Sequence, residues 1–199
     1  MTAAQGQGEG PPARSVRLFV AVDVPDDVKA VVAETIEPFR DRIPGARWTR
    51  REGWHVTVKF LGATWPRMIE PVKEAVRTAA NGAAPFGTAM TVLGAFPSVR
   101  RARVLSAGLT DQEGRFAALV ESLDELLVED FTPEDRAYTP HLTVARLQTP
   151  RALDEFVPEL PGLSVASRPF DVGGMVLYQS HVSRQGATYE PLLETPLTG

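Results

Sequence analysis

The stretch GWHVTVKFLG, residues 53–62, has a partial repeat farther along the chain, TPHLTVARLQ at residues 139–148. Each stretch contains a histidine, an apolar residue, a threonine and a valine in that order, beginning at His55 and at His141. The whole chain has only three histidines. Both stretches are rich in β-branched and apolar residues, which favours strands. Two of the three histidines are therefore expected at the heads of two similar strands.

The spacing of these residues determines which of them share a face. Successive side chains of a strand point to opposite faces, so His55 and Thr57 lie together, as do His141 and Thr143. The intervening valine and leucine anchor each strand in a core. If the two strands come from two facing lobes, two imidazoles and two hydroxyls line one cleft.

Such a cleft suits the chemistry of a phosphodiester. One neutral imidazole can accept a proton from the attacking oxygen while an imidazolium protonates the leaving oxygen, because histidine titrates at about 6.5. Threonine hydroxyls can donate hydrogen bonds to the non-bridging oxygens. We expect no metal and no cofactor, since the sequence contains neither HExxH nor GxxxxGK[ST]. The alternative that both histidines are structural strand residues stays open.

The remaining sequence mixes strands and helices, which predicts an α+β fold rather than a series of βαβ units. Strands are expected over residues 15–24, 47–50, 54–62, 86–96, 101–109, 138–147, 170–180 and 187–194, the last two as a hairpin. Helices are expected over about 25–36, 66–80 and 113–128, with a short one at 151–157. Gly173 and Gly174 inside a strand suggest a bulge.

Composition narrows the class of protein. The 199 residues are 43% hydrophobic and 23% charged, as in ordinary globular proteins. The net charge of −4 argues against broad, non-specific binding of nucleic acid. Residues 1–14 are small, polar and rich in glycine and proline, so we expect a disordered tail before one domain over 15–199. The absence of cysteine fits a cytoplasmic location, and no apolar run is long enough for a membrane span.

Taken in order, several motifs resemble the two-histidine phosphoesterase family, and within it the bacterial RNA 2′,3′-cyclic phosphodiesterases, also called 2′-5′ RNA ligase-like proteins. The resemblance extends from Val16 to about Leu193. The motifs that carry it are RLFVAVDVP, WHVTVKFLG, FPSVRRARVL, YTPHLTVAR and the closing LYQS and YEPL. It implies a bilobal, LigT-like α+β fold in which two pseudo-symmetric lobes of mainly antiparallel sheet flank a central cleft.

The resemblance also implies metal-independent hydrolysis of an RNA 2′,3′-cyclic phosphate end to a 2′-phosphate. The roles that it implies are proton donor for His55, proton acceptor for His141, phosphate ligands for Thr57 and Thr143, and nucleotide contacts for Phe60 and Arg146. By strict alternation the last two point away from the histidines, so a bulge, a strand end or sheet twist must redirect them. Ser106 stands where relatives often have tryptophan.

Other substrates and functions remain open at this point. The substrate is expected to be RNA with a cyclic phosphate end or a small cyclic nucleotide. The alternatives are a 2′-5′ RNA ligase, a phosphodiesterase for 2′-5′ oligonucleotides, or an RNA-end binding module without catalysis. We expect a cytoplasmic monomer with no membrane or metal partner.

Overall fold

The computed structural model describes residues 14–133, 136–183 and 186–199. The expected disordered tail, residues 1–14, lies outside these residues except for the exposed Arg14. The helices are α1 (Asp26–Ile36), α2 (Ile69–Asn81) and α3 (Arg115–Leu126), with 3-10 turns at Glu37–Phe39, Arg51–Gly53, Pro66–Met68, Val99–Arg101 and Leu153–Glu155. The strands are β1 (Val16–Asp23), β2 (Ala46–Trp48), β3 (His55–Thr64), β4 (Phe86–Thr88), β5 (Met90–Phe96), β6 (Ala102–Leu109), β7 (His141–Arg151), β8 (Phe170–Val172), β9 (Gly174–Ser183) and β10 (Gly186–Pro196).

The α+β class is confirmed, and two expected strands are each divided in two. Residues 86–96 form β4 and β5, which belong to different sheets. Residues 170–180 likewise divide at Gly173 into β8 and the start of β9. The expected bulge at Gly173 and Gly174 is therefore wrong, because the chain passes there from the small β4–β8 sheet into the large one.

Among the described residues, eight strands form the large sheet, in the order β10-β9-β1-β3-β7-β6-β5 with β2 beside β7. Every pairing is antiparallel. In the described chain, β3 and β7 pair through Val56 and Leu142 alone. This narrow junction divides the sheet into a first half-sheet (β10, β9, β1 and β3) and a second half-sheet (β7, β6, β5 and β2).

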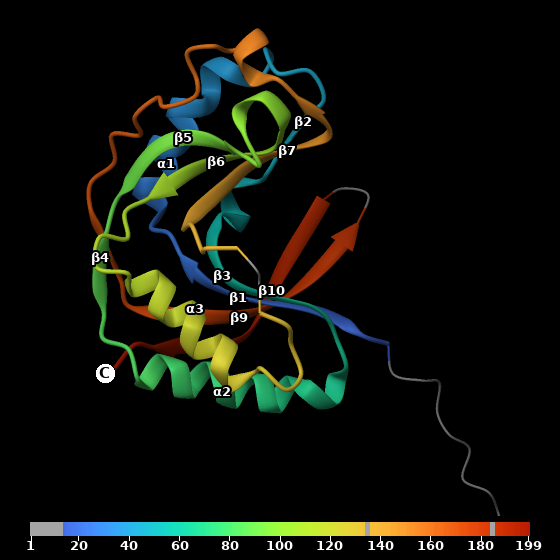
Figure 1. Cartoon of the computed structure of the whole chain (residues 1–199), viewed down its shortest axis with the longest axis vertical. Helices are drawn as coiled ribbons and strands as arrows, with labels where there is room; N and C mark the ends of the chain where they lie inside the picture. Colours follow the sequence, from blue (N-terminus) through green and yellow to red (C-terminus); the bar gives the residue numbers. More distant parts are fainter. Residues whose placement is uncertain (1–13, 134–135, 184–185) are drawn as a thin grey trace, which may run out of the picture.

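Each half-sheet has its own helices. Figure 1 shows α2 and α3 against the half-sheet that contains β1, β3 and β9, while α1 lies beside β5 and β6 of the other. The helix α1 follows β1 in the chain, yet it lies with the second half-sheet. The β9–β10 hairpin extends out of the first half-sheet toward the second (Figure 1).

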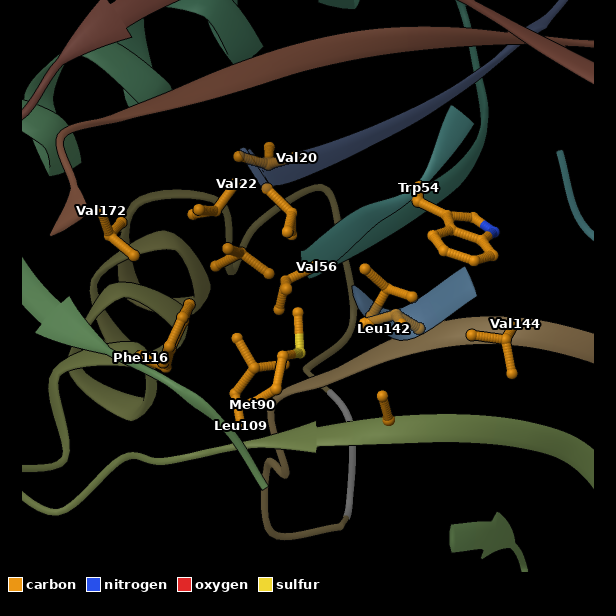
Figure 2. Packing of buried hydrophobic residues seen from close by; sticks show 14 of the residues in the cluster. Val20, Val22, Trp54, Val56, Met90, Leu109, Phe116, Leu142, Val144 and Val172 are labelled. Atoms are coloured by element: carbon orange, nitrogen blue, oxygen red, sulfur yellow. The ribbon is translucent and has the colours of Figure 1, made fainter. Parts of the chain in front are cut away.

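The core lies on the face of the sheet opposite the predicted histidine pairs. Val56 and Leu142 are fully buried, and Figure 2 shows them side by side from the two central strands. Burying such a side chain stabilises the fold by about 1.5–3 kcal/mol. These two residues therefore attach both histidine strands to one core, as alternation predicts.

One charged pair lies within this apolar environment. Lys59 of β3 is buried, with its side chain only 5% exposed, and its ammonium contacts Asp124 of α3. This contact links the first half-sheet to its covering helix. None of the helices in the described part of the chain is long and apolar enough to cross a membrane.

Candidate active site

The strand register brings the two predicted motifs together. Because β3 and β7 are antiparallel and Val56 pairs with Leu142, His55 lies opposite Thr143 and Thr57 opposite His141. His55 and His141 are then diagonal neighbours, whose Cα atoms lie about 7–8 Å apart in a regular antiparallel pair. Both imidazoles therefore start from the same face of the sheet, on either side of the Val56–Leu142 pair.

Two matching bulges follow the motifs. In the β1–β3 pairing Val58 has no partner, because Val20 pairs with Lys59 and Ala21 with Thr57. In the β6–β7 pairing Val144 is skipped in the same way. Each bulge comes three residues after its histidine and reverses the alternation beyond it.

The bulges turn the side chains of Phe60 and Arg146 to the other face of their strands, as a nucleotide contact would require. Only Arg146 then lines the cavity. Arg146 returns to the face of His141 and lines the cavity described below. Phe60 is 49% exposed and lies outside that cavity, with the Arg17 guanidinium 5.3 Å from its ring centroid. The bulge at Val58 nevertheless returns Phe60 to the exposed face of β3 that His55 and Thr57 share, and its contact with a nucleotide stays a prediction.

Both histidines are held through the same ring nitrogen. Nδ1 of His55 lies 2.8 Å from the carbonyl oxygen of Gly53, and Nδ1 of His141 lies 2.8 Å from that of Thr139. A carbonyl oxygen only accepts, so Nδ1 carries the hydrogen in each ring. Nε2 is left on the opposite side of the ring to exchange protons.

Aromatic rings enclose His55. Phe19 stacks on the imidazole with ring centroids 4.7 Å apart, and Tyr189 meets it edge-on at 5.1 Å. Burial lowers the pKa of His55 to about 4, against the smaller opposing effects of the Gly53 carbonyl and the Asp23 carboxylate. The ring is thus neutral near pH 7 in the unliganded protein.

His141 has a more open setting. It is half-buried, and the ring of Phe96 packs against it with centroids 4.7 Å apart. Gly108 of β6 lies opposite His141, and Ser106 lies opposite Thr143. The neighbouring strand therefore presents only small residues beside this motif. Ser106 is itself buried, with 2% of its surface exposed.

A cavity of about 910 Å³ opens onto this row of residues. Its wall includes four of the six predicted site residues, namely His55, Thr57, Thr143 and Arg146. His141 adjoins the cavity through its register beside Thr57, although it does not line the wall itself. The predicted histidine and threonine pairs thus lie in one region, at the junction of the half-sheets.

The segment before His55 is tied to the opposite motif strand. The Thr49 hydroxyl donates to the carbonyl oxygens of Thr143 and Val144 at 3.0 and 2.9 Å, and it accepts from the Trp54 indole at 2.7 Å. Trp54 is buried immediately before His55. These bonds couple the position of one histidine to the strand of the other.

Sequence reasoning missed the contribution of the first and last strands. Asp23 of β1 lies directly opposite His55, and its carboxylate accepts a hydrogen bond of 2.9 Å from the Tyr178 hydroxyl. Burial and the hydrogen bond to Asp23 raise the pKa of Tyr178, which keeps the phenol protonated. Tyr178 and Tyr189 lie in the closing motifs of the resemblance, but their sequence spacing carries no signal of contact with His55.

The described residues contain no group of three or more His, Asp or Glu side chains placed to hold a metal ion. They offer the His55 imidazole, two threonine hydroxyls and arginine guanidinium groups in one cavity wall, with the His141 imidazole on the neighbouring strand. This combination can transfer two protons and bind an anion between them. The fold and the arrangement of these residues are those that the resemblance to the two-histidine phosphoesterases implies.

Comparison with known proteins agrees with this class. The sequence model of the family described as LigT like phosphoesterase matches residues 22–106 and 109–189. A Methanothermobacter thermautotrophicus protein named RNA 2′,3′-cyclic phosphodiesterase is 32% identical over 178 residues, which are 87% of this chain and 95% of the relative. A Geobacillus stearothermophilus protein of the same name is 29% identical over 91% of this chain, and the chain spans 57% of its length. The chain belongs to the LigT-like phosphoesterase family.

Solved structures show the same fold. The crystal structure of TT0787 from Thermus thermophilus matches with a TM-score of 0.76 and 28% identity, over 92% of this chain and 98% of that one. The E. coli LigT structure in its apo form matches with a TM-score of 0.70 and 21% identity, over 94% and 99%. The bilobal LigT-like architecture is therefore confirmed.

Proposed function

We propose that this protein hydrolyses RNA 2′,3′-cyclic phosphate ends to 2′-phosphates, without a metal ion. The observation that carries the proposal is the placement of His55, Thr57, His141 and Thr143 in two antiparallel strands around one junction. The names of the relatives support the same activity. The proposed activity is that of an RNA 2′,3′-cyclic phosphodiesterase, which is a phosphoric diester hydrolase.

The reaction needs one proton removed and one supplied. Nε2 of His141 takes a proton from water as its oxygen bonds to phosphorus, and Nε2 of His55 gives a proton to the departing 3′ oxygen. The P–O3′ bond breaks and the 2′ oxygen keeps the phosphate. In-line displacement requires the two groups on opposite sides of phosphorus, which suits the diagonal placement of the histidines across β3 and β7. The Thr57 and Thr143 hydroxyls donate to the non-bridging oxygens.

If His55 is the proton donor, its pKa should rise when an anion binds. With a pKa of about 4 in the unliganded protein, only about one ring in a thousand is protonated at pH 7. A donor must be protonated, and an adjacent anion favours the charged form. We therefore expect bound inorganic phosphate to raise the pKa of His55 by at least one unit. NMR titration of the ring protons with and without phosphate measures this, and an unchanged pKa would assign the donor role to His141 instead.

A second prediction concerns the threonines. Thr57→Val and Thr143→Val keep the shape of the side chain and remove the hydroxyl. A hydrogen bond to a charged group contributes about 1.5–3 kcal/mol, so each change should lower kcat roughly ten- to a hundredfold. Melting temperatures should move little. Variants that melt early and turn over normally would make these threonines structural.

Product analysis tests the function itself. The protein is incubated with an RNA that ends in a 2′,3′-cyclic phosphate, with EDTA present, and the products are resolved by mass spectrometry and thin-layer chromatography. We expect a gain of one water and a 2′-phosphate end. Activity lost in EDTA and restored by a divalent metal would contradict the mechanism. Binding without conversion over hours would favour an RNA-end binding module, and joined products a 2′-5′ ligase.

We further propose that the protein acts as a cytoplasmic monomer with one domain over residues 15–199. Both histidines and both threonines come from one chain and meet at one junction, so the proposed reaction needs no second subunit. The absence of cysteine fits a reducing compartment. Sedimentation at micromolar concentrations tests the assembly state, and a stable dimer would contradict it.

A further inference from the structure

Two arginines face each other on one wall of the cavity. Arg47 of β2 is the direct cross-strand partner of Arg146 of β7, and both are exposed. Both line the cavity that His55 and Thr143 also line. Arg146 comes from the second motif, and Arg47 lies eight residues before the histidine of the first.

This pairing is unfavourable in the absence of an anion. Like charges directly opposite each other on neighbouring strands destabilise a sheet. Among the described residues, neither guanidinium forms a hydrogen bond or an ion pair with another side chain, although ten other ion pairs occur. Two uncompensated positive charges therefore face an open cavity. Paired guanidinium groups are well suited to a phosphate, which they can bind through parallel N–H donors.

The arginines lie beyond the site of the reacting phosphate. Arg146 follows Thr143 by three residues on the same strand, roughly 10 Å at about 3.3 Å per residue. Gln148, two residues farther, also lines the cavity. The negative groups of the cavity wall lie near the other end, since Asp23 is opposite His55 and Glu52 is three residues before it. Arg47 and Arg146 thus place two positive charges on β2 and β7, and Arg50, also in the wall, follows the end of β2 by two residues.

Another part of the cavity wall is formed by the start of β10, at Gly186, Ala187, Thr188 and Tyr189. The cavity volume of about 910 Å³ is near the upper end of the usual range for small-molecule sites, roughly 300–1,000 Å³. A single phosphate uses a small part of it.

We propose that Arg47, together with Arg146, binds the phosphodiester on the 5′ side of the terminal nucleotide. The substrate class is then an RNA strand of two or more nucleotides rather than a cyclic mononucleotide. The inference rests on the proposed function, because the cyclic phosphate between the histidines sets the position of the next phosphate. A cyclic phosphate end has RNA only on its 5′ side, so the strand continues from His55 and Thr143 toward the arginines.

The test compares substrate lengths in wild type and Arg47→Gln. Substrates are a 2′,3′-cyclic mononucleotide and di-, tri- and tetranucleotides with the same cyclic end. We expect wild type to prefer the dinucleotide about tenfold in kcat/KM, the value of one charge-assisted contact. Arg47→Gln should abolish that preference. The matched control is Arg77→Gln on α2, which removes the same charge from a residue that pairs with Glu74 away from the cavity.

Binding measurements separate this inference from the proposed function. Fluorescence anisotropy of a labelled tetranucleotide that ends in a 3′-phosphate measures binding to Arg47 and Arg146 without any turnover. The slope of log K against log salt concentration should become shallower by about 0.7 in Arg47→Gln, which is the value for one phosphate contact on a single strand. The inference is overturned if the length preference is absent in wild type or is retained in Arg47→Gln. If substrates of every length stay unhydrolysed, the proposed function is wrong. The salt dependence of binding then still shows whether Arg47 and Arg146 bind a phosphate of the strand.

Discussion

Replacement of His55 or His141 by alanine is expected to lower kcat by about 10²–10⁴-fold, the usual contribution of a positioned proton-transfer group. This corresponds to roughly 3–5 kcal/mol of transition-state stabilisation. Both rings hold their Nδ1 hydrogen on a backbone carbonyl and leave Nε2 for the reaction. Steady-state kinetics on an RNA with a 2′,3′-cyclic phosphate end measures the loss.

The third histidine provides a matched control. His181 is exposed on β9, and its Nε2 lies 2.9 Å from the Glu190 carboxylate on β10, outside the cavity wall. His181→Ala should retain wild-type turnover. The double variant of His55 and His141 should be little worse than the poorer single one, because groups that act as a unit are not additive. Full activity in either single variant would eliminate the two-histidine mechanism.

The second large effect is expected on stability, at the ion pair between Lys59 and Asp124. Lys59 is buried with its side chain 5% exposed, and Asp124 of α3 is 22% exposed. Asp124→Ala leaves the ammonium buried without a partner, which typically costs about 3–5 kcal/mol. The partial exposure of Asp124 places our expectation near 3 kcal/mol. The melting temperature should therefore fall by about 6–12 °C for a chain of this length.

Two further variants show whether the buried charge is the cause. Glu125→Ala removes an exposed carboxylate from the next position of the same helix and should leave melting nearly unchanged. Lys59→Met in the Asp124→Ala background removes the unpaired ammonium and should recover most of the lost stability. Failure of that rescue would show that Asp124 stabilises the fold through contacts other than the ion pair.

The two motifs, and the face on which each presents its side chains, were predictable from the amino-acid sequence. Strand alternation is a local property of the backbone, so the pairing of His55 with Thr57 and of His141 with Thr143 follows from spacing alone. The core positions Val56 and Leu142 follow for the same reason, and both are fully buried. Hydrophobic periodicity likewise located the three α-helices to within a few residues.

For the residues that follow the motifs, the face of the sheet on which each side chain lies depends on the tertiary structure. Strict alternation places Lys59 on the face of His55 and Thr57, yet it is buried in the core on the opposite side. The bulge at Val58 causes this reversal, and the equivalent bulge at Val144 turns Arg146 into the cavity. A bulge depends on the register with a neighbouring strand, which local sequence does not encode.

The environment of the site also depends on contacts between distant segments. The low pKa of His55 results from its burial, to which Phe19 of β1 and Tyr189 of β10 contribute by packing against the ring. Arg47 meets Arg146 only because β2 pairs with β7. The reacting groups were predictable because their spacing is a local property of the sequence. The protonation of His55 and the pairing of Arg47 with Arg146 depend instead on contacts between strands that are distant in the chain.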